Sequence, residues 1–163
     1  MILNRRKIKH TSQEEVGYDL GLIVPKKEAH FFTKVRISKK PVAGYGTQAS
    51  KKKYSINHYF LKNKINLKEK YYPAEKIKNI KKFIKKNLKN DNDIVACFNN
   101  KILYGKGDYG HVSLIETINA ETATLAEPQN AKRKRVILPK LIKAMIYHGR
   151  NKNRGGFWVI SEK

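Results

Sequence analysis

The stretch His111-Val-Ser-Leu-Ile-Glu-Thr-Ile118 is followed, after Asn119-Ala-Glu121, by Thr122-Ala-Thr-Leu-Ala-Glu127. By spacing and composition these two runs predict a β-hairpin. In such a hairpin the strand ends at His111 and Glu127 lie side by side. A carboxylate there can accept the Nδ1–H of the imidazole and fix its tautomer, which is the base–orienter half of a catalytic triad. The alternative is a surface or structural histidine at the end of a strand.

Upstream of the hairpin, the short apolar run 94–98 is typical of a buried strand. A turn at Asn99-Asn100 is expected to lead into a further extended segment over 101–104. Downstream, a helix is predicted to begin at Pro139 and to end with a cap at Gly149. The chain closes with a predicted strand over 155–160. Together with the hairpin, these elements predict an α+β fold with a mainly antiparallel sheet packed with helices.

A further helix is predicted over 73–89, because proline suits the first helical position. Its apolar residues form one stripe, at Ile77, Ile80, Ile84 and Leu88. Lysines cover the rest, and the sequence leaves open whether they form a solvated face or a phosphate track.

The chain is predicted to form a single domain over 1–163 with three parts. Residues 1–15 form a basic N-terminal segment that is extended or loosely helical. Residues 16–72 form a helical or irregular part, with a β-rich stretch over 30–37. Residues 73–163 hold the helix and the antiparallel sheet.

The charge balance is the strongest compositional signal. The chain has 163 residues, with 36 Lys and Arg against 13 Asp and Glu, a formal net charge of +23. Such an excess repels itself, which is easier to understand if a polyanion neutralises it. Nucleic acid is the commonest polyanion, and a membrane surface is the alternative. An AT-rich genome can favour Lys over Arg, but it does not readily explain the shortage of acids.

Four basic clusters are candidate contacts for nucleic acid. They comprise Arg5, Arg6, Lys7, Lys51, Lys52, Lys53, Lys132, Arg133, Lys134, Arg135, Arg150, Lys152 and Arg154. Clusters in loops and termini suit a protein that grips phosphates at several points, as ribosomal proteins do. No RNP-type aromatic strand motif and no Gly-x-x-Gly loop of the KH kind is present.

Other classes of protein are excluded or disfavoured. A single cysteine, Cys97, excludes an internal disulfide and a cysteine-based zinc site. The histidines form no metal-ligand pattern, and we expect no cofactor. The sequence contains no long apolar run and no signal-peptide pattern, so no membrane association and a cytoplasmic location are expected.

The region 75–160 resembles the C-terminal half of papain-like cysteine peptidases of the bacteriocin-leader-processing type. The resemblance rests on Tyr109-Gly-His-Val-Ser-Leu-Ile-Glu116, the hairpin, Ala126-Glu-Pro128, a helix and the closing Gly-Phe-Trp-Val-Ile160. In that family a Gly-His opens this strand and an Asp-Pro ends the next. The resemblance implies a papain-like fold, with His111 at the position of the general base and Glu127 at that of the orienting residue.

The sequence departs from this family at two positions. Glu127 stands where the family has Asp, which adds a methylene. The family's nucleophilic cysteine follows six residues after a glutamine that helps to hold the oxyanion. The best register, over 8–17, puts His10 at the glutamine position and Val16 at the cysteine position. Valine cannot attack a carbonyl, so the resemblance implies an inactive site with vestigial His111 and Glu127.

Two main functions follow. The first is a non-enzymatic, strongly basic RNA-binding protein on an inactive papain-like fold. As a ribosomal or ribosome-associated component it would have rRNA, and also ribosomal proteins, as partners. The alternative is an active cysteine peptidase or thiol hydrolase that uses His111 with Cys97 or with a cysteine from a partner chain. Cys97 lies in an apolar run, where a free cysteine usually acts as a small hydrophobic residue. A third function is an adaptor for an acidic protein.

Overall fold

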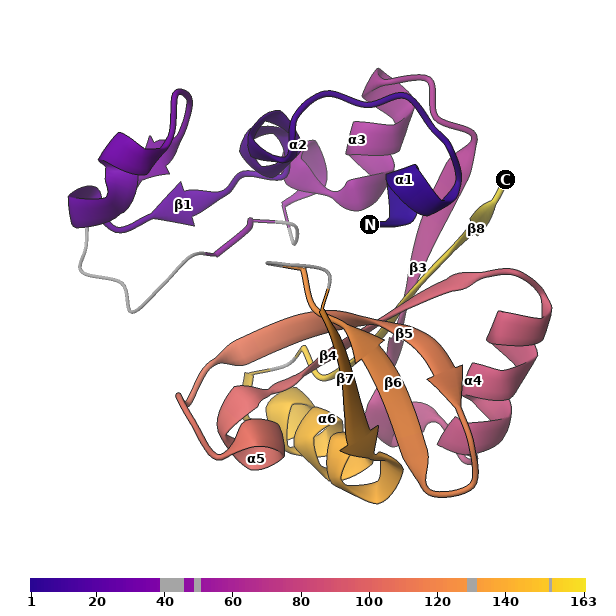
Figure 1. Ribbon diagram of the computed structural model, residues 1–163. Coiled ribbons are helices and arrows are strands. Elements are labelled where there is room, and N and C mark those ends of the chain that lie inside the picture. Colours follow the sequence, from indigo (N-terminus) through magenta and orange to yellow (C-terminus); the bar gives the residue numbers. More distant parts are fainter. Residues whose placement is uncertain (39–45, 49–50, 129–131, 153) are drawn as a thin grey trace. The chain divides into compact units, whose positions relative to one another are not determined.

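A computed structural model describes residues 1–38, 46–48, 51–128, 132–152 and 154–163 (Figure 1). The chain divides into two compact units. One comprises Leu3–Lys68 with Lys163, and the other comprises Met1–Ile2 with Glu69–Glu162. The prediction of a single domain concerns how these units are placed relative to each other, and it stays a prediction.

Short elements make up the Leu3–Lys68 unit. Its α-helices are α1 (Ile2–Arg5), α2 (Gln13–Asp19) and α3 (Ile56–Lys62), and its 3-10 helices are η1 (Lys26–Phe31) and η2 (Lys52–Tyr54). The strands β1 (Ile23–Val24) and β2 (Arg36–Ile37) pair in parallel.

Two local signals explain where these elements begin. Helix α2 begins at Gln13 because Ser12 and Glu15 form a capping box, each side chain bonding the other's backbone N–H. The N-terminal segment is therefore partly helical. The predicted β-rich stretch over 30–37 is wrong in its first half, because a 3-10 turn that starts after Pro25 continues to Phe31.

A six-stranded sheet forms the centre of the Glu69–Glu162 unit. Its strands are β3 (Leu67–Pro73), β4 (Asp93–Asn99), β5 (Gly110–Ile118), β6 (Thr122–Ala126), β7 (Arg133–Ile137) and β8 (Gly156–Glu162), in the order β3-β8-β4-β5-β6-β7. The pairings β8–β4, β4–β5, β5–β6 and β6–β7 are antiparallel. The predicted α+β class with a mainly antiparallel sheet is confirmed. The predicted hairpin and the strands over 94–98 and 155–160 are also present.

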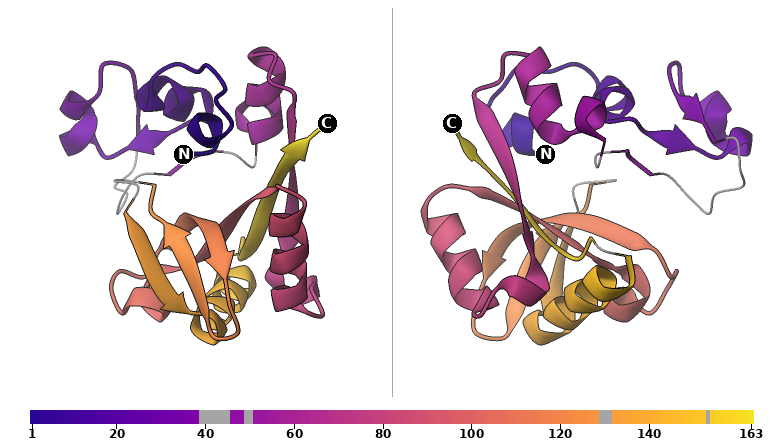
Figure 2. Two further views of the ribbon diagram at one scale, coloured as in Figure 1. Left: turned by 45° about the vertical axis from the view of Figure 1, so that its right-hand side comes forward. Right: turned by 180° about the vertical axis from the view of Figure 1, so that it is seen from behind.

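One face of this sheet carries the hydrophobic core. On β4 this face is formed by the alternate residues Ile94, Ala96 and Phe98, which are fully buried. Helices α4 (Ile80–Lys89) and α6 (Leu138–Lys152) contribute Ile84 and Leu141 to the same buried cluster. Figure 2 shows both helices beside the sheet. The core therefore fixes which sides of α4 and α6 face solvent.

The predicted helix over 73–89 begins later than expected. Pro73 is the last residue of β3, and a 3-10 turn, η3 (Ala74–Lys76), follows it. Helix α4 begins at Ile80 because the Asn79 side chain accepts a hydrogen bond from the backbone N–H of Lys82. The predicted apolar stripe nevertheless packs on the core, since Ile80 and Ile84 are buried.

The segment predicted to be extended over 101–104 is a helix, α5 (Asn100–Tyr104). Asn99 caps its start by accepting from the N–H of Ile102, and Gly105 ends it in the left-handed conformation at φ 78°. Both signals are present in the sequence, since asparagine favours the helix start and glycine the position after its end. The predicted C-terminal cap at Gly149 is also wrong, because Gly149 lies inside α6.

Candidate functional site

The clearest functional cluster is the pair formed by His111 and Glu127. His111 is the second residue of β5, and Glu127 directly follows β6. The distance between His111 Nε2 and Glu127 Oε2 is 2.6 Å. The side chains are 18% and 7% exposed, respectively, so the carboxylate is almost completely removed from solvent. The side-by-side placement predicted from the hairpin is therefore present.

The nitrogen that contacts Glu127 is Nε2, whereas Nδ1 was expected from the sequence. An ionised carboxylate can only accept hydrogen bonds, so the Nε2–H donates to Glu127. The other ring nitrogen, Nδ1, makes no hydrogen bond to the described residues. The ring packs edge-on against Phe98 and Tyr104, at centroid distances of 5.5 and 6.5 Å. These contacts hold the imidazole in place.

Two residues that the sequence analysis did not assign to this site complete the surroundings of Glu127. The Tyr104 hydroxyl donates to Oε1 at 2.7 Å. Lys134 Nζ lies 3.7 Å from the same oxygen and 4.5 Å from the centre of the Tyr104 ring. Tyr104 comes from α5, Lys134 from β7 and His111 from β5, so three separate elements converge on the carboxylate that follows β6.

The electrostatics of the cluster favour an ionised Glu127. Burial alone would raise its pKa, but the hydrogen bonds from His111 and Tyr104 and the charges of His111 and Lys134 outweigh burial. The net result is a Glu127 pKa below its ordinary value. Burial raises the pKa of Tyr104, and the bond to Glu127 raises it further, so its hydroxyl stays neutral. The cluster is thus an anion held by one imidazole, one hydroxyl and one ammonium group.

No nucleophile is aligned with His111 in the described part of the chain. Cys97 pairs with Val112 in the ladder, whereas His111 pairs with Phe98. Successive residues of a strand face opposite sides, so the thiol and the imidazole lie on opposite faces of the sheet. Burial raises the pKa of Cys97 to about 11, an effect that the charge of Arg154 only partly offsets. The Cys97 thiol is therefore protonated, and it points away from the His111 imidazole.

Ser113 shares the face of His111 but lacks the contact that a nucleophile needs. It is 1% exposed, and its hydroxyl makes no hydrogen bond to any described residue, His111 included. His10 and Val16, the positions that correspond to the family's glutamine and cysteine, belong to the Leu3–Lys68 unit. His10 is exposed and bonds to Asn4 and Thr11, and Val16 is half-buried within α2. Neither side chain carries a thiol or a hydroxyl group.

The predicted basic clusters lie on several elements. Arg5 ends α1 and Lys7 follows it, Lys51–Lys53 lie at and before η2, and Arg150 lies in the last turns of α6. Most of these side chains are exposed, namely those of Arg5, Lys7, Arg150, Arg154 and the three lysines at 51–53. The side chain of Arg6 is half-buried. Lys152 ends α6, but its side chain lies outside the described part.

The run 132–135 is expected to be a loop, but Arg133, Lys134 and Arg135 begin the edge strand β7, and Lys132 directly precedes it. Its pairing with β6 extends the sheet, so its side chains alternate between two faces. Lys134 turns towards Glu127. Arg133 turns the other way and binds Glu116 with two nitrogens, at 2.6 and 3.2 Å. The predicted cluster is therefore divided between the two faces of the sheet.

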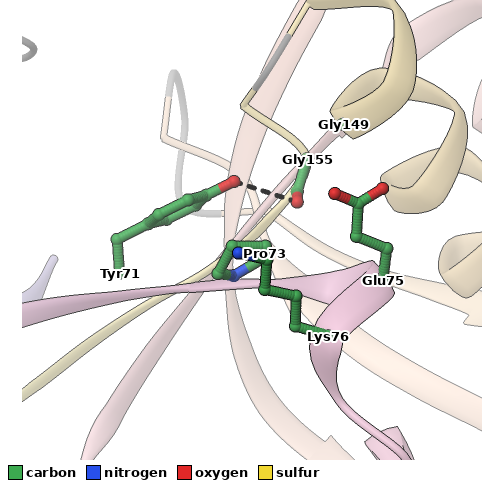
Figure 3. A pocket seen from close by; sticks show the side chains of 6 residues that line it. All are labelled: Tyr71, Pro73, Glu75, Lys76, Gly149 and Gly155. Carbon is green, nitrogen blue, oxygen red and sulfur yellow. Dashed lines mark hydrogen bonds between the residues drawn. The ribbon is translucent and has the colours of Figure 1, made fainter.

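A separate small pocket lies near the end of α6. It is lined by Tyr71, Pro73, Glu75, Lys76, Gly149 and Gly155, and the Tyr71 hydroxyl donates to the Gly155 carbonyl at 3.0 Å (Figure 3). Its volume of about 140 Å³ is below the roughly 300–1,000 Å³ typical of small-molecule sites. A Cβ atom on Gly155 would lie 1.7 Å from the Met145 carbonyl oxygen, so glycine is required by close backbone packing.

Two kinds of site do not occur within the described ranges. No group of three or more His, Cys, Asp or Glu side chains is placed to hold a metal ion. No helix there combines the length and the apolar character needed to cross a bilayer.

Neither the scan against protein-family models nor the search of curated proteins finds a match to this chain. The resemblance to papain-like peptidases therefore stays a prediction.

Proposed function

We propose that this is a non-enzymatic RNA-binding protein built on an inactive papain-like peptidase fold. The observation that carries the proposal is the net charge of +23 on 163 residues. Exposed lysines and arginines occur on short helices, on an edge strand and near the end of α6. Phosphate neutralisation with counterion release is the most direct use of such a surface.

The site at His111 supports the non-enzymatic part of the proposal. A base oriented by a carboxylate is useful in acyl transfer only with a nucleophile in hydrogen-bond reach. The described residues place neither Cys97 nor Ser113 in such a position. The antiparallel pairing of β5 and β6, which brings His111 to Glu127, supports the papain-like part, because the sequence resemblance matches these two residues to the base and the orienting residue of that family.

RNA binding is tested by fluorescence polarisation of the full chain with a labelled single-stranded RNA over a range of salt concentrations. We expect tight binding at low salt and a linear fall of log K with log salt, at about 0.7 per phosphate neutralised. A protein that leaves the RNA free at low ionic strength contradicts the proposal. Ribosome association is tested by co-sedimentation. If RNA binds but ribosomes do not carry the protein, the cytoplasmic ribosomal role fails while RNA binding stands.

The edge strand β7 offers a matched pair of variants for the same assay. Arg133 and Arg135 lie on one face of this strand. Arg133 is held by Glu116, whereas Arg135 is exposed and no described carboxylate lies within ion-pair distance of it. We expect Arg135→Gln to lower the salt slope by about one and Arg133→Gln to lower it less. Two variants with unchanged affinity would show that β7 is not part of the RNA interface.

A cysteine hydrolase is the second candidate, because the His111–Glu127 pair is intact and Nδ1 makes no bond to the described residues. The version with Cys97 requires a reactive thiol on the other face of the sheet. We expect native Cys97 to react with iodoacetamide about 100-fold more slowly than in urea, following its raised pKa. Equal rates in both states would restore this version.

The version with a cysteine from a partner chain has a different test. An electrophilic peptide probe is added to a cell extract that contains the tagged protein. Labelling of a chain that co-purifies with the protein, and its loss in His111→Ala, would favour this version over a purely binding role. The Glu116→Ala variant, which changes a carboxylate on the other face of the sheet, is the control.

A further inference from the structure

Helix α4 carries a stripe of four lysines on the side opposite to its buried residues. The stripe, called here the α4 lysine stripe, consists of Lys82, Lys85, Lys86 and Lys89, and all four side chains are exposed. Their spacing of three, four and seven residues places them on one face of a helix, along about 10 Å of its axis. The sequence alone left open whether these lysines are a solvated face or a phosphate track.

The core fixes the direction of this stripe. Ile80 and Ile84 are buried, and Phe83 packs its ring against Tyr72 and Phe157, at centroid distances of 5.1 and 5.3 Å. The helix cannot rotate without exposing these groups. Lys81, which lies outside the stripe, is half-buried and its Nζ donates to the Ala120 carbonyl at 3.4 Å. The four lysines of the stripe make no such contact, and no described carboxylate lies within ion-pair distance of them.

This arrangement is unfavourable for the isolated protein. Helix α4 contains no acidic residue. Glutamate has nearly the same helix propensity as lysine, so alternating the two would preserve the helix and replace repulsion by attraction. The helix dipole disfavours Lys82 in the first turn but favours Lys86 and Lys89 in the last turn, so the unfavourable contribution is the repulsion between the lysines. An external anion that binds along the stripe removes this repulsion.

The chemistry of the stripe favours a phosphate backbone over a membrane. Membrane-surface helices insert bulky apolar residues beside their basic ones. The large exposed apolar residues of the described chain include none from α4. Lysine is a point charge without the planar fork that arginine uses for bidentate recognition, so it suits phosphate contacts that do not depend on base sequence.

We propose that the α4 lysine stripe is the main contact of this protein with the RNA phosphate backbone and that it binds without reading the bases. This inference rests on the RNA-binding function proposed above and adds the place and the mode of binding. It also assigns RNA contact to four residues outside the basic clusters found from the sequence.

The test compares two quadruple variants of the full chain with equal net charge. The first is Lys82→Gln with Lys85→Gln, Lys86→Gln and Lys89→Gln, because glutamine keeps helix propensity and removes charge. The control changes four other exposed lysines of the same unit, at Lys101, Lys106, Lys140 and Lys143. Both are titrated with single-stranded RNAs of two base compositions, with the Lys→Arg version of the stripe as the rescue variant.

We expect the stripe variant to lose affinity by about tenfold or more at physiological salt and to lower the salt slope by about three. The control should change the slope by about one at most, the arginine version should bind like wild type, and both RNAs should behave alike. Equal losses in the stripe and control variants would overturn this inference but leave RNA binding in place. A wild-type protein that binds no RNA would overturn the proposed function as well. Stripe-dependent binding to phosphatidylserine vesicles but not to RNA would replace RNA by a membrane surface.

Discussion

Two charged regions of the same unit differ in how their charge is neutralised. One is the Glu127 cluster, formed by Glu127, His111, Tyr104 and Lys134, and the other is the α4 lysine stripe. Glu127 is buried and receives a hydrogen bond from His111, another from Tyr104, and the charge of Lys134. The α4 lysine stripe is exposed, and no described carboxylate lies within ion-pair distance of it. The first region is thus neutralised within the fold, whereas the described residues supply no carboxylate to the second, as the proposed contact with an external phosphate backbone requires.

The strongest test of this comparison removes the buried carboxylate. Glu127→Ala leaves His111, Tyr104 and Lys134 facing a space without an anion, so we expect a loss of about 3 kcal/mol in the free energy of unfolding. The control is Glu116→Ala, which breaks the exposed pair with Arg133 and should cost less than about 1 kcal/mol. Urea denaturation measures both. Similar losses in the two variants would contradict the view that burial makes the Glu127 cluster important.

The pH dependence of the free energy of unfolding tests whether the buried Glu127 is ionised. The pKa of Glu127 lies below its ordinary value in the folded protein, so its charge stabilises the fold fully above that ordinary value, 4.5. This stabilisation is lost as the pH falls through the lowered pKa. We therefore expect the stability difference between wild type and Glu127→Gln to have its full size above pH 4.5 and to shrink as the pH falls below this value. A difference that persists unchanged in acid would contradict an ionised Glu127.

Tyr104→Phe examines one contact of the buried cluster. The variant keeps the ring against Phe98 and His111 and removes only the hydroxyl that donates to Glu127. A hydrogen bond to a charged group is worth about 1.5–3 kcal/mol, and we expect a loss near the lower end because His111 continues to hold the carboxylate. Thermal unfolding measures this, and the pKa of Glu127 should rise towards its ordinary value. An unchanged stability would show that Tyr104 contributes only packing.

The smallest expected effect is an increase, not a loss, in the free energy of unfolding. Replacing the α4 lysine stripe by glutamine removes repulsion between lysines three and four residues apart, so the free energy of unfolding should rise by about 1 kcal/mol at low salt. High salt screens this repulsion, and the gain should then disappear. The control variant at Lys101, Lys106, Lys140 and Lys143 separates local repulsion from the effect of lower net charge. A destabilised stripe variant would indicate that these lysines serve the fold rather than a partner.

The parts of the site set by strand spacing could be predicted from the sequence. The hairpin from His111 to Glu127 follows from two β-rich runs joined by three residues, and it brings the two side chains together. Which ring nitrogen faces the carboxylate depends on side-chain rotation about the strand end, so spacing could not determine it.

Tyr104 and Lys134 were missed because the elements that carry them were misassigned. Residues 101–104 contain β-favouring side chains, but the Asn99 cap and Gly105 outweigh them and produce a helix. The basic composition of 132–135 favours a loop, whereas backbone pairing with β6 makes Arg133, Lys134 and Arg135 part of a strand. In α5 the deciding signals are local, namely the Asn99 cap and Gly105, whereas the pairing of β7 with β6 is a contact that only the folded chain provides.

The position of β7 at the sheet edge has a consequence for self-association. An edge strand exposes unpaired backbone groups that can template pairing with another copy of the chain. In β7 that edge carries Arg133, Lys134 and Arg135 in succession. Two such edges that approached each other would bring like charges face to face, so the same residues that enrich the surface in cations also protect the sheet from growing into aggregates.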